Sequence, residues 1–259
     1  MTILHKFVVS GRVVELYLYQ IPLSLEKKPK TGFKRAVSAV SSEAKQDSVK
    51  SGQLRSKRNL RRLVQSNVYQ WYEQGRVYNP MFLTLTFKQN ITDLVVANNA
   101  FMKFVQRMNR KIFEPIGQKM AYVAVVEFQK RGAVHYHMIV FNLPFIADRV
   151  YNTLLKIWRQ NNDDGAIYLE KVGSVKGAVR YISKYLVKNF TDDRLFNKKR
   201  FFCSRNLLRP VVINDDLAAL TLVDIVKFNL EFAFNCGSFP LTGEINYYRF
   251  GLPGYVMVI

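Results

Sequence analysis

The sequence predicts an α+β fold, with a central, mainly antiparallel β-sheet flanked by helices, a basic N-terminal extension and a C-terminal accessory region. Two observations predict it. Strand-like and helix-like patterns alternate along residues 81–190, which favours helices packed on a sheet. Two of the strand segments are separated by a short turn that contains glycine, as in an antiparallel hairpin. With 49% hydrophobic residues, the 259-residue chain has enough apolar side chains for an ordinary core.

Each element follows from its local pattern. Six segments have the alternation or composition of strands, and the first of them forms one or two strands: residues 3–22, 81–87, 120–128, 134–142, 166–172 and 198–206. Four segments have helical periodicity: residues 53–75, 92–113, 146–161 and 174–190. Residues 25–50 have no clear period and predict a loop with at most a helical patch. These patterns predict an N-terminal region of strands and a basic helix (1–75), a core (76–210) and a C-terminal accessory segment packed on that core (211–259).

The charge is strongly basic. Lys and Arg number 39 against 19 Asp and Glu, a formal net charge of +20 and a pI near 10.0, which favours a polyanionic partner such as nucleic acid. Residues 27–62 hold twelve basic and two acidic residues, half of that excess. The run is either a solvated arm or a nucleic-acid surface, and the aromatic residues that follow at 69–72 favour the second. The candidate DNA contacts in it are Lys57, Arg58, Arg61 and Arg62.

The chain has few cysteines and an interrupted apolar start. Cys203 and Cys236 are too few for a disulfide framework or a cysteine-rich zinc site. The N-terminal apolar segment is broken by charges, so it is neither a signal peptide nor a membrane span. We therefore expect a cytoplasmic protein without a membrane partner, in a bacterial host if a phage or plasmid encodes it.

Two of the three histidines lie in one strand segment. Successive side chains of a strand alternate, so His135 and His137 face the same side. A three-residue turn at 130–132 would pair Glu127 with His135 and bring the carboxylate to the same face. Two imidazoles and a carboxylate suit a divalent ion that acts on a phosphate. The alternative is a pair of hydrogen-bonded core histidines, but an unpaired carboxylate in an apolar strand is costly.

The helix at 174–190 carries two tyrosines one turn apart. Its apolar stripe is expected to pack on the sheet, and it comprises Val175, Val179, Ile182 and Leu186. An adjoining stripe comprises Tyr181, Lys184, Tyr185 and Lys188. Nearby lysines favour a phenolate, and a phenolate that attacks a DNA phosphodiester would leave a phosphotyrosine link. Taken alone, the helix fits equally an amphipathic helix whose lysines reach into solvent.

Three ordered segments together resemble the HUH endonucleases, and among them the rolling-circle replication initiators of the two-tyrosine type found in small circular single-stranded DNA phages and related plasmids. "FLTLTF" (82–87) is similar to their first motif, and "HYH" (135–137) to the His-hydrophobic-His motif, with Glu127 in the place of the acidic ligand. "YISKYLVK" (181–188) is similar to the tyrosine motif, and "RFFCSRNLLRP" (200–210) to the segment that comes after that motif in such proteins. The resemblance spans 81–210, roughly half of the chain.

This resemblance implies an HUH/RRM-like sheet with the hairpin at its middle, and an endonuclease core at 76–210. It implies Mg²⁺ or Mn²⁺, a nick in single-stranded origin DNA, a 5′-phosphotyrosine intermediate and a free 3′-hydroxyl that primes synthesis. The residue roles carried over are metal ligands for Glu127, His135 and His137, nucleophiles for Tyr181 and Tyr185, phosphate stabilisation for Lys184, and DNA contact for Lys188. Tyr181 is the expected first nucleophile, because single-tyrosine relatives place theirs three residues before the lysine.

Partners and alternatives follow from the same motifs. The sequence has no G-x-x-x-x-G-K-[ST] motif, so a host helicase and polymerase are expected as partners. An HUH transposase or a mobilisation relaxase would use the same chemistry. The position of the tyrosines after the histidines disfavours a relaxase, and their pairing disfavours a single-tyrosine transposase. A non-catalytic nucleic-acid-binding protein would need the basic and aromatic residues, but not the carboxylate, histidines and tyrosines together.

Overall fold

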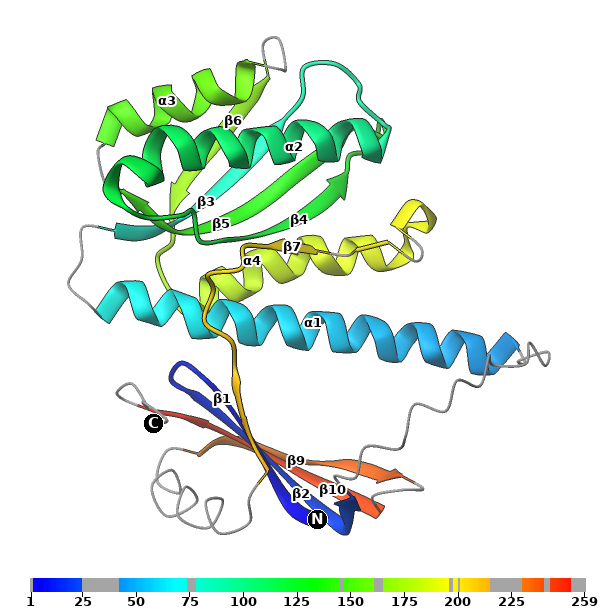
Figure 1. The fold of residues 1–259 in the computed structure, drawn as a ribbon. Helices are drawn as coiled ribbons and strands as arrows, with labels where there is room; N and C mark the ends of the chain where they lie inside the picture. The colour runs from blue at the N-terminus through cyan, green and yellow to red at the C-terminus, as the bar shows by residue number, and fades with distance from the viewer. Residues whose placement is uncertain are drawn as a thin grey trace. The chain divides into compact units, whose positions relative to one another are not determined.

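The computed structural model describes most of the 259 residues. The described ranges are 2–24, 42–73, 78–144, 147–160, 165–195, 198–199, 201–214, 230–239 and 243–252. The first part of the predicted basic arm, up to residue 41, lies outside the described residues. The chain divides into two compact units, residues 1–52 with 209–259 and residues 53–208 (Figure 1), whereas the sequence placed boundaries after 75 and after 210.

The first unit contains a five-stranded antiparallel sheet made from both ends of the chain. Its order is β8–β1–β2–β10–β9. The strands are β1 (Thr2–Ser10), β2 (Val13–Ser24), β8 (Val211–Ile213), β9 (Leu230–Phe239) and β10 (Gly243–Gly251). Phe7, Val14 and Phe250 are among the buried residues that form its core. The C-terminal segment thus supplies strands to the sheet that the N-terminal hairpin begins.

The second unit contains the sheet that carries the histidines. Its order is β6–β3–β5–β4–β7, and every pairing in it is antiparallel. The strands are β3 (Tyr78–Thr86), β4 (Tyr122–Phe128), β5 (Val134–Pro144), β6 (Ala166–Lys171) and β7 (Phe201–Cys203). β5 is the middle strand, and its side chains are buried from Val134 to Leu143. The predicted α+β class, with a central antiparallel sheet, is confirmed.

Helices cover both faces of this sheet. α2 (Leu94–Met108) and α3 (Ala147–Arg159) pack on one face, while α4 (Val175–Lys188) and the second half of α1 (Ser42–Glu73) pack on the other (Figure 1). Short helical turns follow α2 at Asn109–Phe113 and Glu114–Ile116, and follow α4 at Asn189–Thr191 and Asp193–Leu195. The α1/α4 face is the one toward which the side chains of the two histidines point.

α1 begins earlier than its apolar pattern predicts. Residues 42–52 are helical, although the sequence placed most of them in a loop. Helical periodicity is visible in a sequence only where one side of the helix is buried. In α1 the buried side begins at Leu60 and continues through Leu63, Val64 and Val68. The preceding residues are mostly polar, and several of them, such as Ala44 and Lys45, are good helix formers.

Phe101 of α2 is expected to be among the costliest positions to truncate. Its side chain is fully buried, and its ring stacks on that of Tyr136, with centroids 4.5 Å apart and planes at 12°. We expect Phe101→Ala to lower the free energy of unfolding by about 3–5 kcal/mol. The neighbouring Met102 points outward and is 43% exposed, so Met102→Ala should cost less than about 1 kcal/mol. Urea denaturation of both variants measures the difference, and equal midpoints would contradict this packing.

Candidate functional site

The site is built on the β4–β5 hairpin. The backbone N–H of Gln129 donates to the carbonyl of Ala133 at 2.9 Å, and Gly132 takes a positive φ of 86°, which suits glycine. This turn pairs Glu127 with His135, as its length predicts. Ile139 packs with α4 on the face of the histidines, while Tyr136 packs with α2 on the other face. The predicted register and the predicted facing of the side chains are therefore both observed.

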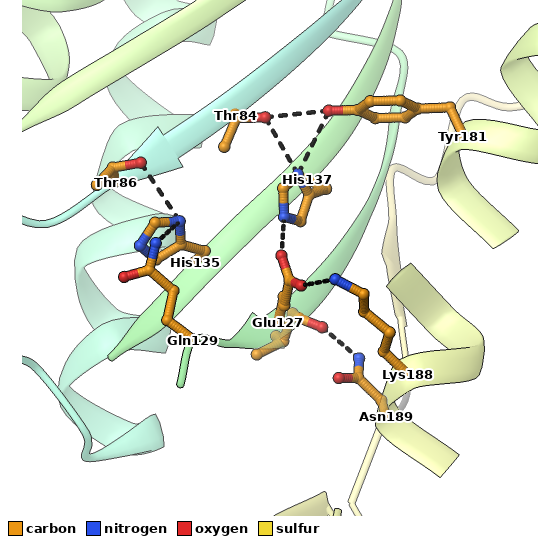
Figure 2. Close-up of polar contacts among 10 residues, drawn as sticks. Thr84, Thr86, Glu127, Gln129, His135, His137, Tyr181, Lys188 and Asn189 are labelled. Carbon is orange, nitrogen blue, oxygen red and sulfur yellow. Dashed lines mark hydrogen bonds and ion pairs between the residues drawn. The ribbon is translucent and has the colours of Figure 1, made fainter. Parts of the chain in front are cut away.

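Glu127, His137 and Tyr181 form a continuous chain of polar contacts (Figure 2). Nε2 of His137 lies 2.5 Å from a carboxylate oxygen of Glu127, and Nδ1 lies 3.3 Å from the Tyr181 hydroxyl. The Thr84 hydroxyl completes the cluster, at 3.1 Å from Nδ1 and 3.0 Å from the Tyr181 oxygen. A carboxylate oxygen only accepts, so Nε2 carries the ring hydrogen and Nδ1 is an acceptor. In this arrangement, the tyrosine hydroxyl is within hydrogen-bond reach of a base that a carboxylate orients.

The charges of these groups follow from burial and contact. Burial by itself would raise the pKa of Glu127, but hydrogen bonds from His137 and Lys188 outweigh it and lower the pKa to about 2. Burial lowers the pKa of His137, and it lowers that of His135 to about 4, with the charge of His137 acting in the same direction. At neutral pH the site therefore holds one ionised carboxylate and two neutral imidazoles, the protonation states of metal ligands.

His135 has a polar environment on one side of its ring only. Its Nδ1 lies 3.4 Å from the Thr86 hydroxyl and 3.4 Å from the side-chain amide of Gln129. Its Nε2 is buried and has no hydrogen-bond partner among the residues that the structure describes. Buried polar atoms usually have a partner, so an orphaned imidazole nitrogen calls for one. This atom is the feature of His135 that fits a metal ion.

α4 brings both tyrosines to the histidine. The predicted stripe packs on the sheet, with Ile182 and Leu186 fully buried and Val175 and Val179 partly buried. One turn apart on the same helix, Tyr181 packs its ring on Phe82 (centroids 4.1 Å apart) and Tyr185 stacks on His137 (3.3 Å, planes at 9°). Both phenols thus approach one imidazole from the helix side.

The lysines of α4 do not approach the Tyr181 hydroxyl as the sequence suggested. Nζ of Lys188 lies 2.5 Å from Glu127, and Nζ of Lys184 lies 5.7 Å from the centroid of the Tyr185 ring. Burial raises the pKa of Tyr181, and its hydrogen bond with Thr84 offsets only part of that rise. Tyr181 is therefore a phenol at neutral pH, and its deprotonation requires help from the bound substrate, a metal or a base.

The three predicted metal ligands share one face, but they are not gathered as a metal centre. In the described ranges, no group of three or more His, Cys, Asp or Glu side chains is arranged to hold a metal ion. Glu127 and His137 contact each other, and Lys188 occupies the second carboxylate oxygen. A cation would have to replace these contacts. The residue types, their neutral imidazoles and the orphaned Nε2 of His135 fit one, so the ligand assignment stays a prediction.

Four polar residues at the site were not singled out from the sequence. They are Thr84, Thr86, Gln129 and Asn189, whose buried amide donates to the carbonyl of Val126. For the threonines a signal was present, because "FLTLTF" alternates and puts both hydroxyls on one face of β3. The pairing of Thr84 with His137 and of Thr86 with His135 depends on the β3–β5 register, which local sequence does not contain.

The four predicted DNA contacts lie on α1. Leu60 and Val64 face the α1/α4 core, while Lys57 and Arg58 are exposed and Arg61 and Arg62 are half-buried. No helix in the described part of the chain is long and apolar enough to cross a membrane. A helix that covers the site-bearing face of the sheet therefore presents exposed positive charge.

Comparisons with known proteins point to DNA replication. Residues 80–190 match the family model of the replication-associated protein ORF2, a span that includes every residue of the contact network around His135 and His137. The chain is 28% identical over 142 residues to the Phasyl DNA replicon protein arp of Escherichia coli, which covers 47% of this chain and 48% of that protein. The chain thus spans about half the length of this relative. No solved structure matches. The two similarities support a replication-initiator family.

Proposed function

We propose that this protein initiates rolling-circle replication by nicking and rejoining single-stranded origin DNA through a 5′-phosphotyrosine intermediate. The observation that carries the proposal is the convergence of the Tyr181 hydroxyl and the Tyr185 ring on His137, beside the ionised Glu127. A binding protein needs no phenol hydroxyl within 3.3 Å of an imidazole that a carboxylate orients. Similarity to a replication-associated family supports the biological setting.

The reaction transfers a phosphodiester from a deoxyribose to a tyrosine. The Tyr181 oxygen bonds to phosphorus, and the bond from phosphorus to the 3′ oxygen breaks. The 3′ oxygen leaves with the electron pair and takes up a proton, which gives a free 3′-hydroxyl. The phenol proton passes to solvent, and the exposed ammonium of Lys184 balances charge on the phosphate. Tyr185, one turn along α4, is placed to attack the same phosphorus in a second transfer.

A divalent ion fits the donor set of the hairpin. Glu127 and His137 would hold it together with His135, whose Nε2 lacks a partner among the described residues. Bound Mg²⁺ or Mn²⁺ would withdraw charge from the phosphate under attack. If Nε2 of His137 is a ligand, Nδ1 must carry the ring hydrogen and donates it toward the Tyr181 oxygen, which favours the phenolate. Thr84 then holds the Tyr181 oxygen in place from the sheet side.

The same proposal assigns the partners. Single-stranded origin DNA is the substrate, and a host helicase and polymerase would supply unwinding and synthesis. The exposed basic residues of α1 would contact DNA phosphates, and so would Lys188 once it leaves Glu127. Each of these roles is part of the proposal.

Covalent capture tests the proposed activity. The full chain is incubated with Mn²⁺ and a pool of randomised single-stranded oligonucleotides labelled at the 3′ end, and then run on a denaturing gel. A 5′-phosphotyrosine link retains the 3′ label on the protein, whereas a pool labelled at the 5′ end should give only free, shortened strands. The expected result is a labelled protein band with the first pool alone. Label on the protein from the 5′-labelled pool, or from neither pool, would contradict the proposal.

The basic residues of α1 should set the salt dependence of DNA binding. We expect replacement of Lys57, Arg58, Arg61 and Arg62 by alanine to reduce the slope of log affinity against log salt by about 0.7 for each lost phosphate contact. A control with the same loss of charge replaces Lys103, Arg110, Lys111 and Lys156, which lie on the α2/α3 side of the sheet. Fluorescence anisotropy at several salt concentrations measures both slopes. Equal slopes for the two variants would remove α1 from the DNA interface.

A further inference from the structure

The edge strand β6 places an aromatic ring and a carboxylate beside the tyrosine helix. β6 lies next to β3, where Tyr168 pairs with Thr84 and Glu170 pairs with Phe82. Cross-strand partners point to the same face, so both β6 side chains lie on the face that carries the histidines. Leu169 between them points to the opposite face and packs on the α2/α3 core.

Tyr168 presents its ring to solvent in a held orientation. It is 57% exposed, and its hydroxyl donates to Oε2 of Glu170 at 3.1 Å. That hydrogen bond raises the pKa of Tyr168, so the hydroxyl remains a donor at neutral pH. A rigid, exposed ring of this kind offers a stacking surface for another aromatic group.

Both side chains lie close to the Tyr181 hydroxyl or ring. Thr84, the partner of Tyr168, contacts the Tyr181 hydroxyl at 3.0 Å, and Phe82, the partner of Glu170, packs on the Tyr181 ring. Burial is the main cause of the raised pKa of Tyr181, and the Glu170 charge acts in the same direction, as expected for a nearby carboxylate. Neighbouring strands are about 5 Å apart, so a nucleotide next to a phosphate at Tyr181 reaches β6.

The charge of Glu170 determines which part of a nucleotide this surface accepts. A carboxylate repels phosphates, but it accepts hydrogen bonds from the amino groups of cytosine, adenine and guanine. Thymine carries a carbonyl oxygen at the corresponding position and would be repelled. We propose that Tyr168 and Glu170 form a nucleobase subsite, in which Tyr168 stacks on the base next to the scissile phosphate and Glu170 selects an amino-bearing base over thymine. This role in substrate selection rests on the proposed nicking function.

Binding without metal tests the subsite separately from nicking. Anisotropy of labelled oligo-dC and oligo-dT, two pyrimidine polymers of equal length, is measured with the full chain in EDTA. Wild type should bind oligo-dC about tenfold more tightly than oligo-dT. Glu170→Ala should bring that ratio close to one. Tyr168→Ala should weaken both polymers by about tenfold or more, whereas Tyr168→Phe should retain most of the affinity for both.

The control is Tyr151→Ala, which removes an exposed tyrosine from α3 on the opposite face of the sheet. It should bind both polymers as wild type does. Wild-type affinity in Tyr168→Ala, or a preference for oligo-dC that is absent in wild type or persists in Glu170→Ala, would overturn the subsite. If these binding changes occur but the capture experiment gives no adduct, the subsite stands and the nicking proposal fails. An adduct from a Tyr168→Ala protein that binds as wild type does is the reverse case.

Discussion

Replacement of Tyr181 by phenylalanine should abolish the covalent protein–DNA adduct, with a loss of roughly a thousandfold or more in its rate of formation. The reason is the oxygen alone, because phenylalanine keeps the ring that packs on Phe82. The hydroxyl has hydrogen-bond contacts to Thr84 and His137, so the free energy of unfolding should change by only about 1 kcal/mol. Capture on a denaturing gel, beside a thermal unfolding curve, measures both quantities.

Tyr185→Phe is the matched control, since it removes the same atom one turn away. Its ring stacks on His137 and should remain there. The first nick should persist in Tyr185→Phe, while transfer of the attached strand to a second oligonucleotide should be lost. An adduct that survives in Tyr181→Phe and disappears only in the double variant would show interchangeable nucleophiles. An adduct in the double variant would exclude both tyrosines.

Removal of divalent metal should abolish the adduct as completely as loss of the nucleophile does. EDTA should suppress the labelled band, and Mn²⁺ should restore it. Glu127→Gln keeps the shape of the side chain but removes its charge, so its Mn²⁺ midpoint should rise by about tenfold or more. Glu114→Gln, at an exposed carboxylate beyond the end of α2, should leave the midpoint unchanged. Titration calorimetry with Mn²⁺ measures binding without reference to activity.

The structure also defines what a different result would mean. In the arrangement described, Nδ1 of His137 is an acceptor near the Tyr181 hydroxyl, and Glu127 orients the ring. If nicking persists in EDTA, this carboxylate–histidine relay carries the reaction, and the metal assignment is wrong. Lys188 separates the two cases further, because it contacts Glu127 at 2.5 Å. Lys188→Met should tighten Mn²⁺ binding if the ion replaces that ammonium, and should have no such effect otherwise.

The fold class and half of the site were predictable because their signals are local. A three-residue turn determines the register of a hairpin, so the pairing of Glu127 with His135 followed from the spacing of residues 127–135. Helical periodicity likewise placed Ile182 and Leu186 against the sheet and both tyrosines on an adjoining side. Where a helix has no buried side, as in residues 42–52 of α1, this signal is missing and the element was not predicted.

By itself, the sequence determined the elements, the hairpin register and the chemical types at the site, since each depends on neighbours within a few residues. Only the tertiary structure decided which groups meet. It placed Thr84 and Tyr168 beside Tyr181, and it paired Lys188 with Glu127 rather than with a phenol. It also joined the strands of both chain ends in one sheet. These contacts join residues far apart in sequence, and their pairing depends on how strands and helices pack, which no local period encodes.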